Sequence, residues 1–447
     1  MKYRIFFVWM LLILLISKSC RKSHFELPVG SEVITDKGRG TGTVTWNKEM
    51  NLVLEGFVFV NDGQVLTIEP GTIIRFKAGQ GATASALIVA RGGKIIANGT
   101  KDEPIVFTAK SDDLNGSIAK DATGLWGGIL ILGRAPLNTD FGKDFIEGIP
   151  ASEPRGEYGG SLIDDNSGEL SFISIRYAGS TLYHDNEING LTLGGVGNAT
   201  KIENIEIINS ADDGIEIFGG TVSLKNIISF HSDDDAIDYD LGYQGKMQFV
   251  LAVQAAGNAG NLIEGSGALD PVYQKPYSIP YLSNLTLIGN QDTIAGKVIS
   301  LNRFAGGTIV NSIMVEQQLG ATIEYTNAST DCYSQWLTGK LKIENNVHYN
   351  VGSNIPDSIF KLNGIGMGDE LIQNWADYFE LGNNEIKDVG ISAQIEFNYL
   401  PKVSTGDNLY NHTDTWFETT NYKGAFGTYD WTEGWSSFDE HWTKNIE

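Results

Sequence analysis

Apolar and polar residues alternate over short runs along most of this chain, and clusters of glycine, asparagine and aspartate separate the runs. The first such run is 43–46, and others follow at 65–68, 73–76 and 105–108. Alternation with a period of two indicates strands with one buried face, and the turn residues mark where each strand ends. The pattern therefore predicts many short strands at even spacing, which is typical of a solenoid or a sandwich.

The segment 204–240 contains one pattern twice and decides between these two architectures. Matching residues lie 22 positions apart: Asn204 and Asn226, Ser210 and Ser232, Asp212-Asp213 and Asp234-Asp235, Ile215-Glu216-Ile217 and Ile237-Asp238-Tyr239. A fixed period of this size signals stacked repeats, and it is too short for paired helices. A unit that cannot bury its own apolar face must stack on its neighbours. We therefore predict an all-β fold in which residues 43–349 form a parallel β-helix.

Two breaks interrupt the strand pattern. Residues 134–166 are rich in glycine, proline and charged side chains, and a second break spans 265–280. A loop as long as the first one is usually functional or disordered when it lies inside a solenoid. We expect it to lie over one face of the β-helix.

The strand pattern fades towards the C-terminus. The apolar residues of 370–380 have helical spacing, and five of the nine tryptophans lie from Trp375 onward. An open solenoid end exposes apolar rungs and unpaired strand edges, so we expect residues 350–447 to form an aromatic-rich C-terminal cap. The alternative is an aromatic platform on which sugar rings stack, with Trp431 and Trp435 as its candidate ligand-binding residues.

The first twenty residues have the composition of an export signal. Two basic residues precede a short apolar run, 5–16, and small residues precede Cys20. The run is too short for a permanent membrane span. The segment looks like a bacterial lipoprotein signal, so we predict a signal peptide at 1–19 and lipidation of Cys20; cleavage nearby without lipidation is the alternative. Acyl chains would anchor the protein to a membrane, with residues 20–42 as a tether.

The chain is strongly acidic, with a formal net charge of −23, and removal of residues 1–19 would leave −26. Such a chain is repelled by the phosphates of nucleic acids and by anionic lipid surfaces, so we expect no nucleic-acid partner. Cys332 is the one cysteine besides Cys20. If Cys20 carries a thioether, no internal disulfide can form, and stability must come from the core.

Several longer motifs follow one another along nearly the whole mature chain. They are Thr67-Ile68-Glu69-Pro70-Gly71-Thr72, Leu125-Trp126-Gly127-Gly128-Ile129, the segment 186–196, Asp212-Asp213-Gly214-Ile215-Glu216 and Gly424-Ala425-Phe426-Gly427. In this order they resemble a group of secreted or lipid-anchored bacterial β-helix proteins that is common in the Bacteroidota. The resemblance implies a right-handed parallel β-helix and a location in the cell envelope. It implies little about activity, because the function of that group is largely unassigned.

A column of acidic residues follows from the repeat. Glu216 lies between Ile215 and Ile217, and Asp238 and Glu264 follow at equivalent positions after 22 and 26 residues. If the flanking apolar residues face the core, strand alternation directs the acidic residues outward. Adjacent coils lie about 4.8 Å apart, so these three residues are predicted to form a ladder of carboxylates.

Like charges at this spacing need either a raised pKa or a neutralising cation. Carboxylates suit Ca²⁺, a hard cation, and the candidate ligands are Glu216, Asp238, Asp240 and Glu264. Alternatively, Glu216 and Asp238 could act as acid and base on a glycosidic bond. The third explanation is a solvated acidic face without a ligand.

The aspartate pairs 212–213 and 234–235 have a simpler explanation. Aspartate before glycine or alanine at the entry to a strand hydrogen-bonds to the neighbouring backbone and tolerates turn geometry. Asn204 and Asn226 are likewise expected to stack and to form a side-chain ladder inside a turn.

For function, we expect an outer-membrane lipoprotein of the cell envelope. It would bind an extracellular glycan or other polymer, or a partner outer-membrane protein, without catalysis. The alternatives are a calcium-dependent polysaccharide lyase or glycoside hydrolase that uses the ladder, and a purely structural surface protein. Pectin-cleaving β-helix hydrolases carry an Arg-x-Lys triplet downstream of their aspartates, whereas the one such triplet here, 75–77, lies far upstream.

Overall fold

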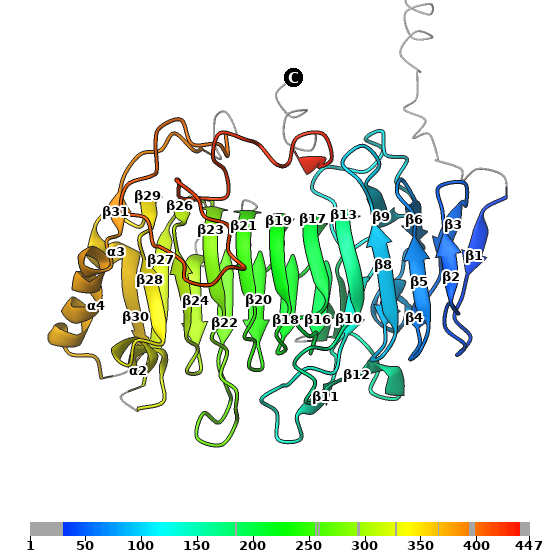
Figure 1. Cartoon of the computed structure of the whole chain (residues 1–447), viewed down its shortest axis with the longest axis horizontal. Helices are drawn as coiled ribbons and strands as arrows, with labels where there is room; N and C mark the ends of the chain where they lie inside the picture. The colour runs from blue at the N-terminus through cyan, green and yellow to red at the C-terminus, as the bar shows by residue number, and fades with distance from the viewer. Residues whose placement is uncertain are drawn as a thin grey trace, which may run out of the picture.

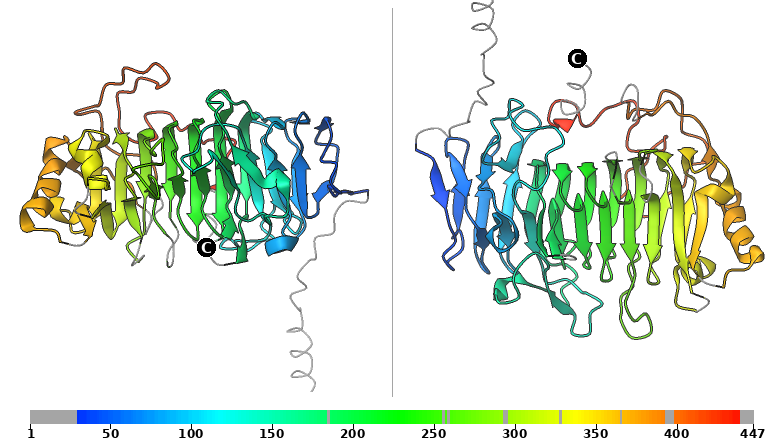
Figure 2. Two further views of the ribbon diagram at one scale, coloured as in Figure 1. Left: turned by 90° about the horizontal axis from the view of Figure 1, so that it is seen from below. Right: turned by 180° about the vertical axis from the view of Figure 1, so that it is seen from behind.

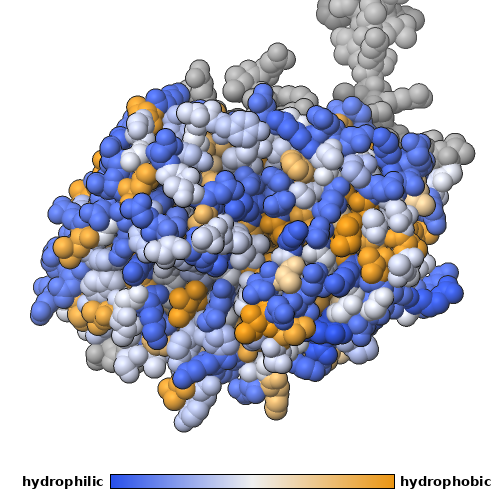
Figure 3. Space-filling view, viewed as in Figure 1, coloured by the Kyte–Doolittle hydropathy of each residue, from blue (hydrophilic) through white to orange (hydrophobic). Residues whose placement is uncertain are grey.

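The computed structural model describes residues 30–183, 186–254, 257, 260–292, 296–326, 329–364, 366–392 and 398–438. These residues form stacked coils of parallel strands, which confirms the predicted all-β solenoid (Figure 1). The predicted signal peptide and Cys20 lie outside the described residues, and lipidation stays a prediction. No helix in the described ranges is long and apolar enough to cross a membrane. The face drawn in Figure 3 is mainly hydrophilic, with apolar residues in separate patches.

The strands of the described residues form two long sheets and two small antiparallel pairs. The first sheet holds β1 (Glu32–Ile34), β2 (Val44–Trp46), β3 (Leu52–Leu54), β5 (Val65–Ile68), β6 (Ile73–Phe76), β8 (Lys94–Asn98), β9 (Ile105–Ala109), β13 (Gly168–Arg176), β17 (Lys201–Ser210), β19 (Ser223–Ser232), β21 (Lys246–Val253), β23 (Tyr281–Ile288), β25 (Gly307–Val310), β26 (Ile313–Gln317), β28 (Leu341–Glu344), β29 (Val347–Val351) and β31 (Glu385–Ile386). The second holds β4 (Phe57–Val60), β7 (Ala86–Val89), β10 (Gly128–Leu132), β16 (Leu191–Gly194), β18 (Ile215–Phe218), β20 (Ile237–Asp240), β22 (Ile263–Ser266), β24 (Lys297–Asn302), β27 (Leu319–Tyr325) and β30 (Phe360–Gly364). The small pairs are β11 (Lys143–Phe145) with β12 (Glu157–Gly159) and β14 (Ser180–Tyr183) with β15 (Asn186–Ile188). The helical segments are η1 (Gly81–Thr83), η2 (Pro154–Gly156), α2 (Cys332–Leu337), α3 (Pro356–Ile359) and α4 (Asp369–Leu381).

The 22-residue repeat corresponds to one coil of the solenoid. In the first sheet Ile205 pairs with Ile227, and in the second Ile215 pairs with Ile237. All four isoleucines are buried in the core between the sheets. Because a shift of one residue would turn these side chains outward, burial of the isoleucines fixes the register of every neighbouring strand.

Asparagine marks a sharp corner within the long strands of the first sheet. Asn204 and Asn226 have φ angles of 54° and 58°, and Asn284 repeats this conformation at 56° two coils further on. Asparagine adopts this left-handed region more readily than other residues with a side chain. The predicted turn at Asn204 and Asn226 is therefore confirmed, whereas the side-chain amide of Asn204 donates to the hydroxyl of Ser171 and not to Asn226. The corner divides each long strand into two faces.

The solenoid begins and ends outside the range that the sequence predicts. β1 pairs in parallel with β3, so residues 32–34 belong to the first coil and not to the predicted 20–42 tether. At the other end β30 pairs with β27 and β31 pairs with β29, which extends the coils beyond residue 349. The alternating pattern is too short in these marginal strands to be recognised.

The C-terminal region covers the end of the solenoid and then one of its sides. The predicted helix 370–380 is present as α4, which lies at the end of the coils with Trp375 fully buried (Figure 1). The residues after β31 turn back and run along the coils towards β13 (Figure 2). The predicted cap is therefore present at α4. The tail, 387–438, covers one side of the coils and not only their end.

The tail is held by side chains of the corner asparagines and by a second core. Asn311 and Asn345 donate their side-chain amides to the backbone oxygens of Tyr410 and Asn408 at 3.0 and 2.8 Å. Lys423 is fully buried and pairs with Glu385 at 2.9 Å. Outward apolar residues behind the corner, such as Ile208 and Phe230, pack against Phe426, Trp435 and Phe438 of the tail.

Candidate functional site

The predicted ladder of carboxylates is present on the second sheet. Glu216 pairs in register with Asp238, and Asp238 pairs with Glu264 on the next coil. Their neighbours Ile215, Ile237 and Ile263 are buried, whereas the three acidic residues keep some exposed surface. Strand alternation therefore directs the side chains as the sequence predicts.

The aspartate pairs before the strands join this ladder. Oxygens of Asp213, Glu216 and Asp238 all lie within 4.8 Å of one another, and so do oxygens of Asp212, Asp213 and Asp234. Two of these aspartates bond to the backbone of the next coil and not to that of their own turn: the backbone N–H of Asp235 donates to Oδ1 of Asp213 at 2.8 Å, and the backbone N–H of Asn261 donates to Oδ1 of Asp235.

We call this group the acidic cluster, and it consists of Asp212, Asp213, Glu216, Asp234, Asp235 and Asp238. The signal in the sequence is that both aspartate pairs recur with the same 22-residue period as the ladder. A turn residue that repeats in register must stack on its counterpart one coil away. Sequence reasoning missed the cluster because each pair has a sufficient local explanation.

The loop predicted to cover one face lies against the acidic cluster. Its strands β11 and β12 form a small sheet, and Tyr158 and Ile146 are buried against the solenoid in the same apolar group as Phe218. Gly148 has a φ of 70°, and a Cβ there would lie 2.2 Å from Ile188, so only glycine fits. Glu147, the residue before it, lies beside Glu216 and forms a side-chain hydrogen bond with it.

Burial raises the pKa values of the cluster. Burial, and next the charge of Glu147, raises the pKa of Asp212 to about 8. The same two causes, in the same order, hold the pKa of Glu216 well above its usual range. For Asp213 and Asp238 the pKa is also held well above the usual range by burial and then by neighbouring carboxylates. Without a cation, part of the cluster must therefore be protonated at neutral pH.

Several oxygens of the site lack a partner. Oδ1 of Asp238 is buried without a hydrogen bond among the described residues. Asn189 is fully buried; its Nδ2 donates to Oε2 of Glu216 at 2.6 Å, while its Oδ1 has no partner. Within the described chain, no lysine or arginine forms an ion pair with Asp213, Glu216 or Asp238. Carboxylate and amide oxygens together are the donor set that Ca²⁺ prefers.

A family model described as a pectate-lyase-like beta helix domain matches residues 38–367. The chain belongs to the pectate-lyase-like β-helix family. The matched range includes the acidic cluster and the covering loop, and it ends before the tail. No curated protein and no solved structure matches this pectate-lyase-like β-helix.

Two of the predicted metal ligands, Glu264 and Asp240, lie outside the two groups of carboxylates whose oxygens are within 4.8 Å of one another. Glu264 accepts hydrogen bonds from the amides of Asn261 at 2.6 Å and Asn302 at 3.0 Å. Asp240 lies at the end of β20, and its Oδ1 accepts from the backbone N–H of Leu241. Neither joins the two groups of oxygens within 4.8 Å. Residues of the aspartate pairs, and not Glu264 or Asp240, supply the further oxygens of these two groups.

The alternative prediction, a sugar platform at Trp431 and Trp435, meets two rings that pack within the protein. Trp435 is buried, and its Nε1 donates to the backbone oxygen of Trp431 at 2.8 Å. Trp431 stacks on Phe426 with ring centroids 5.3 Å apart. The rings of Trp431 and Trp435 both pack in the second core between the tail and the solenoid. The ring of Trp435 therefore offers no free face to a ligand.

Proposed function

We propose that the protein is a calcium-binding β-helix protein that binds an extracellular polysaccharide without cleaving it. One observation carries the cation site: oxygens of Asp213, Glu216 and Asp238 lie within 4.8 Å of one another beneath a covering loop. Three carboxylates at this distance repel one another unless protons or a cation neutralise them. Calcium accepts several carboxylates together with an amide oxygen such as that of Asn189.

Membership of the pectate-lyase-like β-helix family supports a polysaccharide ligand and is compatible with either binding or cleavage. The site favours binding. The oxygens of Glu216 and Asp238 lie within 4.8 Å of each other and are partly covered, with Glu147 beside Glu216. A general acid and base need access to a glycosidic oxygen between them, and this crowded arrangement leaves little room for a polymer.

Thermal unfolding tests the cation site. The purified chain without residues 1–19 should melt at a higher temperature in excess Ca²⁺ than in chelator, because a ligand that binds only the native state stabilises it by about 2.7 kcal/mol at roughly 100 times Kd. The double variant Glu216→Gln/Asp238→Asn should lose this difference. Glu324→Gln removes a carboxylate from the same sheet outside the cluster and should retain it. An unchanged melting temperature of the wild-type chain in chelator would contradict the site.

The enzyme alternative is tested on the same samples. Incubation with polygalacturonate and with neutral glycans in excess Ca²⁺ should give no new reducing ends and no unsaturated products. If the wild-type chain cleaves a glycan and Glu216→Gln does not, the protein is a lyase or hydrolase and the proposal of binding without cleavage is wrong.

We also propose that the protein is a cell-envelope lipoprotein attached through Cys20, and an outer-membrane partner protein is the alternative ligand. The basic residues, the apolar run 5–16 and the cysteine support this proposal. Metabolic labelling with a fatty acid should mark the wild-type chain and not Cys20→Ser. Equal labelling of both proteins would show that the lipid is attached at a residue other than Cys20.

A further inference from the structure

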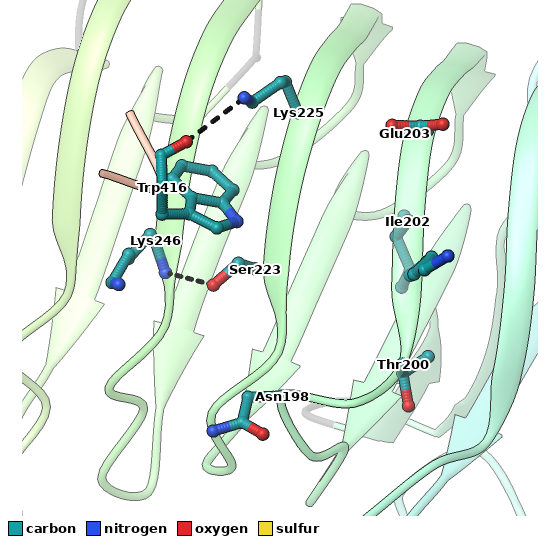
Figure 4. Close-up of a pocket in the computed structure, with 9 residues that line it drawn as sticks. Asn198, Thr200, Ile202, Glu203, Ser223, Lys225, Lys246 and Trp416 are labelled. Atoms are coloured by element: carbon teal, nitrogen blue, oxygen red, sulfur yellow. Dashed lines mark hydrogen bonds between the residues drawn. The ribbon is translucent and has the colours of Figure 1, made fainter. Parts of the chain in front are cut away.

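A trough lies on the first sheet, on a different sheet from the acidic cluster. Two adjoining cavities of about 390 Å³ each share Asn198, Ser223 and Lys246 in their walls. Figure 4 shows one of them, with Trp416 of the tail on one side and Ile202 and Glu203 of β17 on the other. The tail thus forms one wall of the trough, and the solenoid forms the floor.

The floor consists of outward side chains in front of the asparagine corner. Lys201 pairs in register with Ser223, and Glu203 pairs with Lys225, so two polar rows cross the coils. The spacing between rungs is that of neighbouring strands, about 4.8 Å. From Gln248 onward the tail covers these rows: the backbone N–H of Glu418 donates to Oε1 of Gln248 at 2.8 Å. The row on β17 is left open beside it, and on β19 Ser223 stays partly exposed whereas Lys225 contacts the tail.

Trp416 stands where the tail stops covering the sheet. Its ring is half-buried, with the ammonium groups of Lys225 and Lys246 at 4.8 and 5.9 Å from the ring centroid. Lys225 of β19 also donates to the backbone oxygen of Trp416 at 3.3 Å, which holds this part of the tail against the solenoid. The indole N–H makes no hydrogen bond within the described residues, and Figure 4 shows it directed towards the open part of the trough. The indole therefore offers an apolar surface and a hydrogen-bond donor side by side.

The charges of the trough are balanced. Lys225 lies 3.1 Å from Glu418, Lys246 pairs with Asp414, and Lys201 lies 3.6 Å from Glu169. Glu203 adds one further carboxylate at the exposed edge. The trough therefore carries no excess of positive charge, so an anionic ligand would gain little electrostatic attraction there.

We propose that this trough binds a neutral polysaccharide, with one sugar ring stacked against Trp416 and its hydroxyls bonded to the polar rows on β17 and β19. This inference rests on the proposed function, because it names the ligand class and the place of the polysaccharide. Hydroxyl, amide, ammonium and carboxylate groups line the trough, so both donors and acceptors of a polyol find partners. The floor strands are paired on both sides, so an extended peptide finds no free backbone edge. Trp416 lies beyond the matched family range, which makes the trough a feature of this chain's own tail.

Affinity electrophoresis through gels that contain laminarin, mannan, xylan or polygalacturonate tests the proposal, followed by calorimetry with oligosaccharides of the retarding glycan. We expect at least one neutral glycan to retard the wild-type chain, and Trp416→Ala to weaken its binding roughly tenfold or more. Lys201→Ala/Glu203→Ala changes only exposed side chains of the floor on β17 and should also weaken binding. Tyr429→Ala removes an exposed ring elsewhere on the tail and is the matched control.

Each contrary result has a distinct meaning. If a neutral glycan binds the wild-type chain and both trough variants equally, the trough is overturned and the proposed function stands. If polygalacturonate alone binds, the neutral ligand class is overturned. If no glycan binds while Ca²⁺ still raises the melting temperature, both the trough and the polysaccharide part of the proposed function are overturned, and the cation site is retained.

Discussion

Glu216 and Asp238 occupy the same position on two successive coils, paired in register and within 4.8 Å through their carboxylate oxygens. Strand pairing alone dictates this contact, because the two residues are equivalent in a 22-residue repeat. The contact becomes unfavourable through burial, which removes the water that would screen two negative charges. The fold therefore stores a local repulsion at this point that a bound cation or a shared proton relieves.

The first prediction concerns pH. In the folded protein burial raises the pKa of Asp212 to about 8 and raises the pKa of Asp238 as well, whereas in the unfolded chain both lie near 4. Between these values the native state binds more protons than the unfolded chain, so the free energy of unfolding falls as pH rises from about 4 to about 8. In chelator, melting temperatures at pH 5.5 should exceed those at pH 8. In excess Ca²⁺ the difference should shrink, and an equal slope with and without Ca²⁺ would contradict the site.

The second prediction separates the ligand set seen in three dimensions from the one predicted by sequence. Asp213 belongs to both close groups of oxygens, whereas Glu264 belongs to neither. Asp213→Asn should therefore weaken Ca²⁺ binding roughly tenfold or more, and it should stabilise the chain in chelator by about 1 kcal/mol because the crowded group then has one carboxyl fewer. Glu264→Gln should leave Ca²⁺ affinity within about threefold. Titration calorimetry measures the Ca²⁺ affinity of both variants. A larger loss of affinity in Glu264→Gln than in Asp213→Asn would favour the ligand set predicted from the sequence.

The third prediction concerns the buried His348. Neither ring nitrogen has a hydrogen-bond partner among the described residues, and burial, followed by the charge of Lys423, lowers the pKa of His348 to about 3. Below pH 6.5 the unfolded chain takes up a proton that the folded protein refuses, so stability is lost as pH falls from 6.5 towards 3. His348→Leu should raise the free energy of unfolding by about 2 kcal/mol more at pH 5 than at pH 7.5. Denaturant unfolding at the two pH values measures this, and a pH-independent effect would rule it out.

The fourth prediction concerns the corner at Asn226, whose φ is 58°. Asn226→Ala should destabilise the protein by about 1 kcal/mol, because alanine is strained in the left-handed region. Asn226→Gly should be close to neutral, since glycine adopts this region freely. The Asn226 side chain makes no hydrogen bond within the described residues, so the comparison isolates the backbone conformation. Similar losses for alanine and glycine would instead indicate a packing role.

Much of the fold can be predicted from the sequence because the strands repeat. Alternation around Ile215 and Ile237 sets which side chains enter the core, and the period sets which residues stack. The margins were less predictable: Glu32–Ile34 and Glu385–Ile386 are strands of three and two residues, too short for a periodic signal. Trp416 could not be singled out, because nothing local distinguishes a tryptophan at a trough from Trp435 in a core.

By itself, the sequence determined the solenoid, the corner at Asn204 and Asn226, and the outward column of Glu216, Asp238 and Glu264. These features depend on contacts between equivalent residues of neighbouring coils, and a repeat encodes such contacts directly. The tertiary structure alone decided that the loop at 134–166 covers the column, that the aspartate pairs complete it, and that the tail runs back along the coils. Those contacts join segments that share no period, so they follow from complementary shape and burial, which appear only once the chain is folded.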